Sequence, residues 1–546
     1  MREIDRLTIE ELGIPSHQLM QAAAKACFLE IEKKYSGKLA GKKVRILSGT
    51  GNNGGDGAAL GLFLLEAGAR IELILFGRME QTRGDARANF ERLHKAASDT
   101  AGRDKLSFIE CEEIESWKTL CASSVVPDII VDAMFGTGLN RPLSGLFADV
   151  INDLATIRCH RENTLKSGAL ILSVDIPSGL DSDSFRPIGP AVQADLTVTF
   201  TAPKIANVVP PASHLNGKLV VAKIGSPEVL VDHMASNLFL TEEEDARHWL
   251  RATRYKPESF KNLHGHVLVI AGSRGYTGAA VLCGNAAMSS GAGLTTIATP
   301  ASAQLTIAAT AMQEVMTTSL AETDRGVIAD TAVDYALQLA SKATVVAIGP
   351  GLTAQDEGTR SFVHALVAKR RTPVVIDADG LNCLAPWPSD LRGKEDMPLV
   401  LTPHPGEMLR LLGTTDKAAL DDRVTIARNF ATKHQLILVL KGSRPLVAAP
   451  DGRVFVNPTG NPGLGTAGAG DTLTGLIAGF LAQECAQSVR KVDCLQATIA
   501  ALYVGGLAGD LAARDLGMRS MVASDIREHI PDAICYLDPN GEQYFR

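Results

Sequence analysis

The sequence predicts two unlike α/β domains, residues 1–228 and 229–546, each built on a doubly wound parallel sheet. Three observations support this prediction. The 546 residues, 45% of them hydrophobic, exceed what a single core normally supports. Short apolar runs alternate with helical patterns in both halves, as buried parallel strands and crossover helices do. Each run also ends in a loop of Gly, Pro or Asp, where parallel sheets bind ligands.

Composition excludes several other classes. The 54 basic and 61 acidic residues give a net charge of −7, and no long basic run is present to contact nucleic acid. No apolar run approaches the ~20 residues of a membrane helix, and no signal peptide is recognisable. The nine cysteines form no C-x-x-C pair, which argues against a disulfide framework or a zinc site. We therefore expect a cytoplasmic protein without nucleic-acid or membrane partners.

The first half begins with a strand that runs into a glycine loop. Its expected elements are a strand at 44–49, the loop TGNNGGDG at 50–57, a helix at 58–68, and further strands within 70–77, 128–136, 169–179 and 194–204. The loop region contains G-x-G-x-x-G at Gly49, Gly51 and Gly54, with Glu72 in the next strand, which permits a dinucleotide-dehydrogenase interpretation. Asp56 argues against it, because an acid beside a pyrophosphate would repel the phosphate.

Polar residues at other strand ends favour a cation site. Asn53, Asp132, and Asp175 with Ser178 follow different strands of the expected sheet, and their oxygens suit a hard cation. Taken singly, each acid is more readily explained as a turn or cap residue, but their convergence in one sheet favours the cation. The loop at 136–142 adds Arg141, suited to a phosphate or ribose. Lys204 is either a second positive group or a solvated surface lysine.

The motifs LSGTGNNGGDG, VDAMFGTGLNRP, VDIPSGLD and ADLTVTFTAPK resemble, in this order, those of NAD(P)H-hydrate epimerase domains. The resemblance implies a Rossmann-like three-layer αβα fold, a potassium ion held by Asn53, Asp132 and Ser178, and epimerisation at C6 of a hydrated nicotinamide ring. Asp175 is our candidate for the group that moves protons there. The implied substrate-binding residues are Asn52, Asn53, Gly54, Gly55, Asp56, Gly136, Thr137, Gly138, Leu139, Asn140, Arg141 and Pro142. The upstream helix departs from the family at Gln21 and Ala24.

The second half repeats this alternation with different motifs. Its expected strands lie within 266–273, 294–300, 344–351, 372–380, 398–407 and 436–443. The preceding segment carries Pro227, an acidic run and Pro257, with little strand character, so the boundary is expected near residue 230.

The stretch GTAGAGDTLTG, residues 465–475, marks the start of a buried helix, because apolar residues follow it at helical spacing. Free amides at a helix N-terminus bind anions, and Asp471 at that end can accept a proton from a hydroxyl that attacks phosphorus. This arrangement is typical of ribokinase-like sugar and vitamin kinases. The alternative is a glycine-rich helix start with Asp471 as its cap.

Six motifs of this half resemble, in order, those of ADP- or ATP-dependent NAD(P)H-hydrate dehydratase domains: LHGHVLVIAGSRGYTGAAVLCGNAAMSSGAGLTTIATP, AIGPGL, VVIDADGLN, LTPHPGEM, LKGSRPLV and NPTGNPGLGTAGAGDTLTG. The resemblance implies a ribokinase-like α/β fold with Asp471 as catalytic residue. Implied substrate-binding residues are Tyr276, Gly278, Ala279, Gly351, His404, Pro405, Gly406 and Glu407. Implied nucleotide-binding residues are Lys441, Gly442, Ser443, Arg444, Pro445, Asn457, Thr459, Gly460, Asn461, Gly465, Thr466, Ala467, Gly468, Ala469 and Gly470. Ala467 and Ala469 depart from the family's usual GTGGSGD.

The implied function is repair of hydrated NADH and NADPH, called NADHX and NADPHX. The first domain would interconvert the R and S forms, and the second would dehydrate the S form with ADP or ATP as phosphoryl donor and a magnesium ion. Asp377 and Asp379 either bind that magnesium through water or order a turn. Two alternatives remain: a small-molecule kinase with a stable phosphorylated product, and a non-catalytic partner-binding protein. We expect a homo-oligomer.

Overall fold

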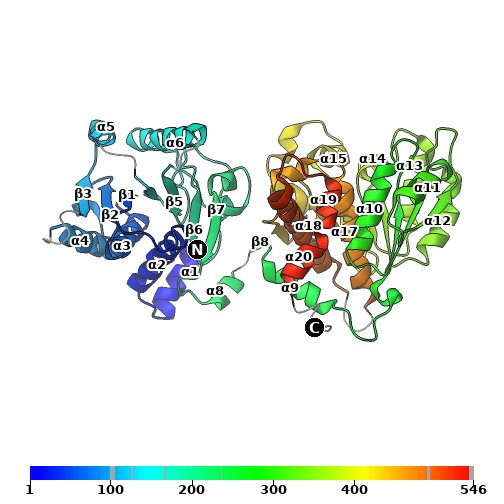
Figure 1. The fold of residues 1–546 in the computed structure, drawn as a ribbon, viewed down its shortest axis with the longest axis horizontal. Coiled ribbons are helices and arrows are strands. Elements are labelled where there is room, and N and C mark those ends of the chain that lie inside the picture. Colours follow the sequence, from blue (N-terminus) through cyan, green and yellow to red (C-terminus); the bar gives the residue numbers. More distant parts are fainter. Residues whose placement is uncertain (99–104, 124–126, 165–167, 235, 488–491, 540–546) are drawn as a thin grey trace. The chain divides into compact units, whose positions relative to one another are not determined.

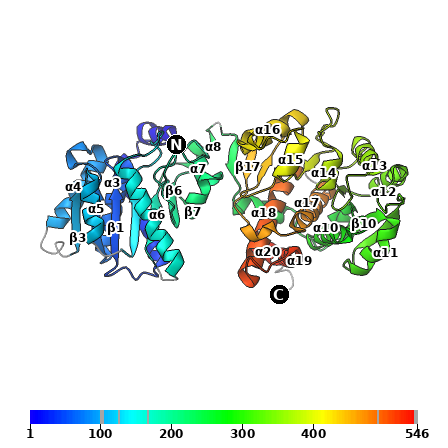
Figure 2. The same ribbon diagram turned by 90° about the horizontal axis from the view of Figure 1, so that it is seen from above.

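The computed structural model describes residues 1–98, 105–123, 127–164, 168–234, 236–487 and 492–539. The chain divides into unit 1 (Met1–Ala235) and unit 2 (Ser236–Arg546), shown in Figures 1 and 2. The boundary expected after residue 228 lies within α8 (Glu228–Asp232), a short helix near the end of unit 1. Each unit carries its own sheet and its own hydrophobic core.

Unit 1 is built on a seven-stranded parallel sheet. Its strands are β1 (Lys43–Ser48), β2 (Arg70–Leu75), β3 (Leu106–Glu110), β4 (Ile129–Ala133), β5 (Leu170–Val174), β6 (Leu196–Phe200) and β7 (Lys218–Ala222), in the spatial order β3-β2-β1-β4-β5-β6-β7. β4, β5 and β6 are buried throughout, including the polar residues Asp132, Ser173 and Thr199. The edge strands β3 and β7 are only partly buried and were not predicted.

Helices cover both faces of this sheet. They are α1 (Arg2–Arg6), α2 (Ser16–Lys34), α3 (Asn52–Glu66), α4 (Gly84–Ser98), α5 (Ile114–Ser123), α6 (Leu146–Thr164), α7 (Ile205–Val208) and α8. In Figure 1, α2, α3 and α4 lie on one face and α5 and α6 on the other. Successive residues of β1 serve the two cores: Ile46 packs in the cluster with Phe90 of α4, and Leu47 in the cluster with Trp117 of α5. The predicted three-layer αβα architecture is confirmed.

The glycine loop is shorter than the sequence predicts, because α3 begins at Asn52 instead of residue 58. Its glycines are close-packing residues. A Cβ on Gly54 would lie 1.8 Å from the carbonyl oxygen of Gly49, and one on Gly57 would lie 2.7 Å from the Cβ of Ala133. The expectation of an extended loop over 50–57 is therefore wrong. The missing side chains allow the helix to start directly against β1 and β4.

Unit 2 contains a ten-stranded sheet. Its strands are β8 (Leu238–Leu240), β9 (His266–Ile270), β10 (Leu294–Pro300), β11 (Met316–Leu320), β12 (Val345–Ile348), β13 (Val374–Ile376), β14 (Leu399–Leu401), β15 (Ile437–Leu440), β16 (Leu446–Ala448) and β17 (Val454–Val456), in the order β11-β10-β9-β12-β13-β14-β15-β16-β17-β8. Strands β9 to β15 are parallel, and β16 is antiparallel to both its neighbours. The six runs predicted as strands all form strands. β8 corrects the expectation that the segment before residue 266 has no strand, since these three half-exposed residues pair with β17.

The helices of unit 2 include two long apolar ones at its core. They are α9 (Glu243–Ala252), α10 (Thr277–Ser289), α11 (Ala301–Thr310), α12 (Val333–Ala340), α13 (Glu357–Ala368), α14 (Asp379–Cys383), α15 (Pro405–Leu411), α16 (Arg423–His434), α17 (Ala469–Ala486), α18 (Cys494–Leu516), α19 (Ala523–Glu528) and α20 (Ile530–Leu537). Among the described residues, α18 alone has the length and hydropathy of a membrane span, but 72% of its most apolar window is buried inside the unit. It is therefore a core helix.

α10 and α17 cross at very close range, because glycines line the crossing. A Cβ on Gly475 would lie 2.0 Å from the carbonyl oxygen of Cys283, and one on Gly479 would lie 1.8 Å from the hydroxyl of Ser290. The N-terminal end of α17 is equally close, since a Cβ on Gly468 would meet Leu282 at 2.4 Å. The starts of both helices are thus held together beside the strand ends of unit 2.

Both sheets reverse their strand order at one point, where parallel sheets bind ligands. In unit 1, β1 lies between β2 and β4; in unit 2, β9 lies between β10 and β12. The glycine loop follows β1, and the segment that carries Tyr276 follows β9. The architecture therefore places motifs singled out in the sequence at both reversal points.

Candidate active sites

The predicted cation ligands of unit 1 gather after β4. The Asp132 carboxylate is buried and accepts hydrogen bonds from the Ser178 amide (2.9 Å), the Ser178 hydroxyl (2.5 Å) and the Ser173 hydroxyl (2.8 Å). Asn53 lies against Gly136, because a Cβ there would be 3.3 Å from the Asn53 amide oxygen. Carboxylate, hydroxyl and amide oxygens of three segments thus adjoin one another.

This cluster is suited to a hard cation. Burial raises the pKa of Asp132, and the hydrogen bonds from the two serines oppose the rise. No described Lys or Arg side chain forms an ion pair with this carboxylate, so its charge is uncompensated by protein. The Asn53 Nδ2 atom is also buried without a hydrogen-bond partner in the described chain. An oxygen-ligated cation fits the uncompensated carboxylate, and the Asn53 amide oxygen is a further candidate ligand.

Lys204 is buried against Asp175, so it is not a solvated surface lysine. Its side chain is 5% exposed, and its ammonium forms an ion pair with Asp175 Oδ1. Asp175 follows β5 with φ at 68°, in the left-handed region that non-glycine residues rarely occupy. A strained strand-end carboxylate and a buried cation therefore stand side by side.

The 136–142 loop divides into exposed and buried residues. Asn140, Arg141 and Pro142 are exposed, and a Cβ on Gly138 would meet nothing within 4 Å. Leu139 is buried in the hydrophobic cluster beneath α6, so its side chain serves packing. The exposed members are the ones available to a ligand.

Glu72 is not available to a ribose, which removes support for the dehydrogenase interpretation. Its carboxylate lies 2.5 Å from the guanidinium of Arg45, its partner on the adjacent strand β1. Arg45 is buried, so the pair is a structural feature of the sheet.

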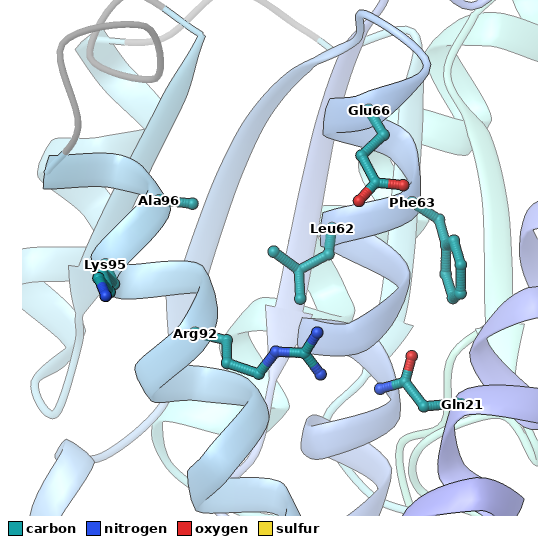
Figure 3. Close-up of a pocket in the computed structure, with 7 residues that line it drawn as sticks. All are labelled: Gln21, Leu62, Phe63, Glu66, Arg92, Lys95 and Ala96. Carbon is teal, nitrogen blue, oxygen red and sulfur yellow. The ribbon is translucent and has the colours of Figure 1, made fainter.

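A groove of about 300 Å³ on unit 1 lies apart from these residues (Figure 3). It opens between α2, α3 and α4 and is lined by Gln21, Leu62, Phe63, Glu66, Arg92, Lys95 and Ala96. The α3 residues belong to the C-terminal half of that helix, whereas the strand ends adjoin its N-terminus. Gln21 donates to Asn89 Oδ1 at 3.0 Å, and Ala24 is fully buried. The two departures from the epimerase pattern therefore serve helix packing.

In unit 2, the glycine run forms the N-terminus of α17. Gly468 caps the helix at φ 84°, and Asp471 is its third residue. Amides of a first helical turn lack intrahelical acceptors, and the helix dipole favours an anion there. The Asp471 carboxyl forms no hydrogen bond within the described chain. An amide cradle and a free carboxyl thus occupy one helix end.

Lys441, Asp377 and Thr474 form a polar cluster beside this cradle. The Lys441 ammonium lies 2.6 Å from Asp377 Oδ1, and the Thr474 hydroxyl donates to Asp377 Oδ2 at 2.6 Å. A Cβ on Gly470 would lie 3.2 Å from the Lys441 Nζ atom. Sequence reasoning did not foresee the Lys441–Asp377 pair. Asp379 instead accepts hydrogen bonds that order its own turn, from the amide of Thr353 and the side chain of Asn382.

Two carboxyls near the cradle have strongly raised pKa values. Burial, followed by the charge of Asp377, raises the pKa of Asp471 to about 7 against the opposing effect of Lys441. Burial likewise raises the pKa of Glu407 to about 7. Glu407 is committed to a helix cap, because it accepts the His404 amide at 2.8 Å while His404 Nδ1 accepts the Gly406 amide at 3.0 Å. Asp471 is therefore the carboxyl left free for proton transfer.

Burial, and then the charges of Lys441 and Arg410, lower the pKa of His404, so its imidazole is neutral at pH 7. Since Nδ1 accepts backbone hydrogen bonds, the neutral ring carries its proton on Nε2. This Nε2–H, which lies 3.4 Å from Glu407 Oε1, is the hydrogen-bond donor of the ring. Pro405 and Gly406 form the first turn of α15 behind it.

Tyr276, Ala279 and Gly351 meet at the reversal point of the unit 2 sheet. A Cβ on Gly351 would lie 2.8 Å from the Tyr276 carbonyl oxygen and 3.2 Å from the Ala279 Cβ. Tyr276 is 61% exposed, and a Cβ on Gly278 would meet open space. These residues therefore form an accessible surface at the N-terminus of α10.

The predicted nucleotide loops are held by residues that the sequence did not point to. Asp510 of α18 accepts the Gly460 amide at 2.9 Å and the Asn461 side chain at 2.9 Å. The Thr459 hydroxyl donates to the Tyr503 carbonyl at 2.9 Å. The loop after β15 is fixed by Arg423, which donates to the carbonyls of Ser443 (3.0 Å) and Lys441 (3.1 Å). Asp510 is an acid within an apolar helix, and that irregularity was the available signal.

Asp510→Asn is expected to weaken nucleotide binding about tenfold, with little effect on kcat. A hydrogen bond to a charged group contributes roughly 1.5–3 kcal/mol, and part of this is retained by the amide oxygen. KM for the nucleotide, measured by steady-state kinetics, tests this. Asp515→Asn, an exposed acid at the end of the same helix, serves as control. An unchanged KM would contradict the anchoring role.

Comparisons with known proteins match separate parts of the chain to two protein families. Residues 267–532 match the family model described as NAD(P)H-hydrate dehydratase, and residues 16–206 match that of the YjeF-related protein N-terminus. A bifunctional NAD(P)H-hydrate repair enzyme of Moorella thermoacetica is 41% identical over 99% of this chain and 97% of that protein. One from Salinibacter ruber is 36% identical over 97% and 94%. A solved ADP/ATP-dependent NAD(P)H-hydrate dehydratase from Bacillus subtilis, co-crystallised with ATP/Mg²⁺, is 30% identical, covers 56% of this chain and 100% of that one, and has a TM-score of 0.47.

Both halves of the chain are thus covered by family models, and near-full-length relatives combine the same two halves. A Rossmann-like three-layer unit is followed by a ribokinase-like α/β unit, as the sequence predicts. The chain belongs to the family of bifunctional NAD(P)H-hydrate repair enzymes, which join an epimerase domain to an ADP- or ATP-dependent dehydratase domain.

Proposed function

We propose that Asp471 is the proton acceptor of the dehydratase and that the amides at the start of α17 bind the phosphate to be transferred. The observation that carries this proposal is a carboxyl free of hydrogen bonds, with its pKa raised to about 7, within a glycine-bounded helix terminus. A base whose pKa is near the working pH is both ionised and basic enough to accept a proton.

The chemistry follows from this placement. Asp471 removes the proton of the C6 hydroxyl, and the oxygen forms a bond to the terminal phosphorus while the bond to the leaving nucleotide breaks. The C6–O bond then breaks with its electrons going to phosphate, and C5 loses a proton. The products are the reduced cofactor, phosphate, and ADP from ATP or AMP from ADP. Phosphorylation converts hydroxide into a better leaving group.

Magnesium is proposed to arrive as a nucleotide complex. No group of three or more His, Cys, Asp or Glu side chains converges on one point in the described chain. Asp377, the acid nearest the cradle, is already bonded to Lys441 and Thr474. Phosphate oxygens would therefore supply most of the ligands, as Mg²⁺ prefers. We propose that Lys441 contacts the transferred phosphate and that His404 orients the ring; the position of Lys441 beside Gly470 supports its role.

The assay that tests the dehydratase assignment uses S-NADHX with ADP or ATP and follows the absorbance of the reduced nicotinamide. Recovery of NADH together with phosphate release is the expected result, and the ratio of the two rates identifies the preferred donor. Nucleotide consumption with a stable phosphorylated product would instead indicate an ordinary kinase.

We also propose a closed homo-oligomer, which light scattering on the purified protein tests.

For unit 1, we propose that Asp175 transfers protons at C6 and that Asn53, Asp132 and Ser178 hold a potassium ion. The uncompensated buried carboxylate of Asp132 and the Asn53 amide oxygen beside Gly136 support a cation there. A bound cation would neutralise Asp132 and fix the two loops that follow β4 and β5.

The epimerisation rate is therefore expected to depend on the potassium concentration. Asp132→Asn should raise the potassium concentration needed for half of the maximal rate more than tenfold. Loss of a residue that supports a metal ligand lowers the metal affinity by ~10–100-fold, and loss of the ligand itself should lower it at least as much. Epimer interconversion is measured against potassium chloride at constant ionic strength with an organic cation. Asp128→Asn, a part-exposed acid paired with Lys42, is the control. Equal rates with and without potassium in the unaltered protein would contradict the proposal.

A further inference from the structure

Lys204 donates to three oxygens in the interior of unit 1. Besides its ion pair with Asp175 Oδ1, its Nζ atom donates to the Thr199 hydroxyl at 2.8 Å and to the Phe200 carbonyl at 3.2 Å. The residue's backbone is fixed as well, since its amide donates to Asn207 Oδ1 at 2.9 Å. Such a lysine has no freedom to follow a ligand, so its effect is exerted through Asp175.

The two oxygens of Asp175 have different surroundings. Oδ1 accepts from Lys204, from the Thr199 hydroxyl at 3.1 Å and from the Phe200 amide at 3.4 Å. Oδ2 forms no hydrogen bond in the described part of the chain. Because the carboxylate cannot rotate without breaking three hydrogen bonds, Oδ2 is the oxygen presented for proton transfer.

Asp56 is a second carboxyl near the same strand ends, because α3 begins directly after β1 and contacts β4 and β5. It lies in the first turns of α3, and its side chain has no hydrogen bond within the described residues. Burial, and then the charges of Asp175 and Asp5, raise the pKa of Asp56 well above its usual value. The charges that act on it are those of Asp175 after β5 and Asp5 of α1. The Cys27 thiol of α2 belongs to the same surroundings, since its own pKa is raised by burial and by both Asp56 and Asp175.

Inversion at C6 requires two groups that transfer protons, one of them ionised to act as a base and the other protonated to act as an acid. C6 bears a hydroxyl and is bonded to ring nitrogen N1, so the ring can open as a sugar ring does. A base removes the hydroxyl proton, C6=O forms, the C6–N1 bond breaks with its electrons going to N1, and an acid protonates N1. After rotation about C5–C6, the reverse steps close the ring on the other face and return both protons. A charged and a neutral carboxyl together perform this cycle without net change.

We propose that Asp175 and Asp56 are this base and acid, and that Lys204 is the positioning residue that directs Asp175 Oδ2 to the hydroxyl proton. The proposal rests on the epimerase role of unit 1 and adds a catalytic residue, Asp56, to it. The geometry that carries it is a carboxylate held by three donors on one oxygen after β5, and a second carboxyl without a described hydrogen bond in the first turns of α3, the helix that contacts β5.

The test uses the full-length protein without nucleotide, so that unit 2 consumes no substrate. Pure R-NADHX is supplied, and the appearance of the S form is followed by chromatography. Asp56→Asn is expected to lower kcat about 100-fold with KM changed less than about threefold, because the amide keeps the shape but cannot donate a proton. Glu66→Gln on the same helix, far from the cluster, is the matched control and should retain the full rate.

The pH profile separates catalysis from folding. In the unaltered protein the rate should fall at alkaline pH as Asp56 loses its proton, and this fall should be absent from the residual rate of Asp56→Asn. Lys204→Met should lower kcat about 100-fold, whereas Lys204→Arg, which can still bond Asp175, should restore part of the rate. An Asp56→Asn variant with the unaltered rate, or one that keeps the alkaline fall, would overturn the proposal. If the unaltered protein fails to interconvert the epimers at all, the epimerase assignment fails instead.

Discussion

Asp471→Asn is expected to slow dehydration of S-NADHX by about 10²–10⁴, the usual contribution of general base catalysis. The amide cannot accept the proton of the C6 hydroxyl, while the cradle that binds phosphate is formed by backbone amides that the substitution leaves in place. Nucleotide affinity should therefore survive, and a loss confined to kcat would identify an interaction specific to the transition state. Stopped assays of NADH formation, with nucleotide binding measured by calorimetry, separate the two quantities.

The pH dependence of the unaltered enzyme supplies a second measurement of Asp471. Its pKa is raised to about 7, and the base must be ionised, so kcat/KM should fall as pH drops through about 7. The stability effect has the opposite sign. Because a raised carboxyl pKa means that the folded state binds the proton more tightly, its stabilisation is present at acid pH and is lost as pH rises towards 7. Asp471→Asn should therefore be at least as stable as the unaltered protein at pH 8, which excludes unfolding as the cause of lost activity.

Glu407→Gln is the informative comparison, since this neighbour has a similarly raised pKa but caps α15. It should change the rate far less than Asp471→Asn, and it should leave the acid limb of the profile in place. A substitution at Asp471 that leaves NADH formation intact would contradict the proposed role. So would a nucleotide that fails to bind to the Asp471→Asn protein.

Gly475→Ala is expected to destabilise unit 2 by about 3 kcal/mol, the upper end of the range for overpacked cores. The added Cβ would lie 2.0 Å from the carbonyl oxygen of Cys283, and backbone cannot yield as a flexible side chain can. Relief requires α17 to move away from α10, which would carry the amide cradle with it. Urea unfolding followed by tryptophan fluorescence and circular dichroism should show an earlier transition for unit 2, with that of unit 1 unchanged.

Gly465→Ala is the matched control. It lies in the same glycine-rich stretch, its φ is not left-handed, and a Cβ there would meet nothing within 4 Å. It should leave the unfolding midpoint within measurement error. Equal stability of the Gly475→Ala and Gly465→Ala proteins would show that the helix crossing relaxes more readily than its geometry indicates.

The sequence was sufficient for most strands inside the sheets, but not for the edge strands β3, β7, β8 and β11 or for the short inner strands β16 and β17. Buried parallel strands are largely apolar, so β1, β4, β9 and β12 stand out as strands despite polar residues such as Arg45 and Asp132. β3, β7 and β8 are partly exposed, and β8, although apolar, has only three residues. The start of α3 was missed for another reason. Glycine is read as a loop former, and only the approach of β1 and β4 shows that these glycines are packing surfaces of a helix.

The site was foreseeable where chemistry sits in short motifs, as with Asp471 in GTAGAGD. It was not foreseeable where partners lie far apart in the chain. Lys441 and Asp377 are 64 residues apart, and only the fold brings the ammonium to the carboxylate. Lys204 illustrates the same limit, since a lysine after a strand gives no sign of whether it turns outward or is enclosed. Asp510 lies on a core helix remote in sequence from the loop that it holds.

The hydrogen bonds of Asp510 and Tyr503 to the loop at 457–461 affect the entropy cost of nucleotide binding. A segment already tethered to a core helix surrenders its conformational freedom when the domain folds, and not when a nucleotide arrives. Nucleotide binding should thus show a small heat-capacity change and little movement of the loop. Substitutions within α18 should change nucleotide affinity although they do not contact the nucleotide. Core residues of unit 2 therefore influence which ligands it binds.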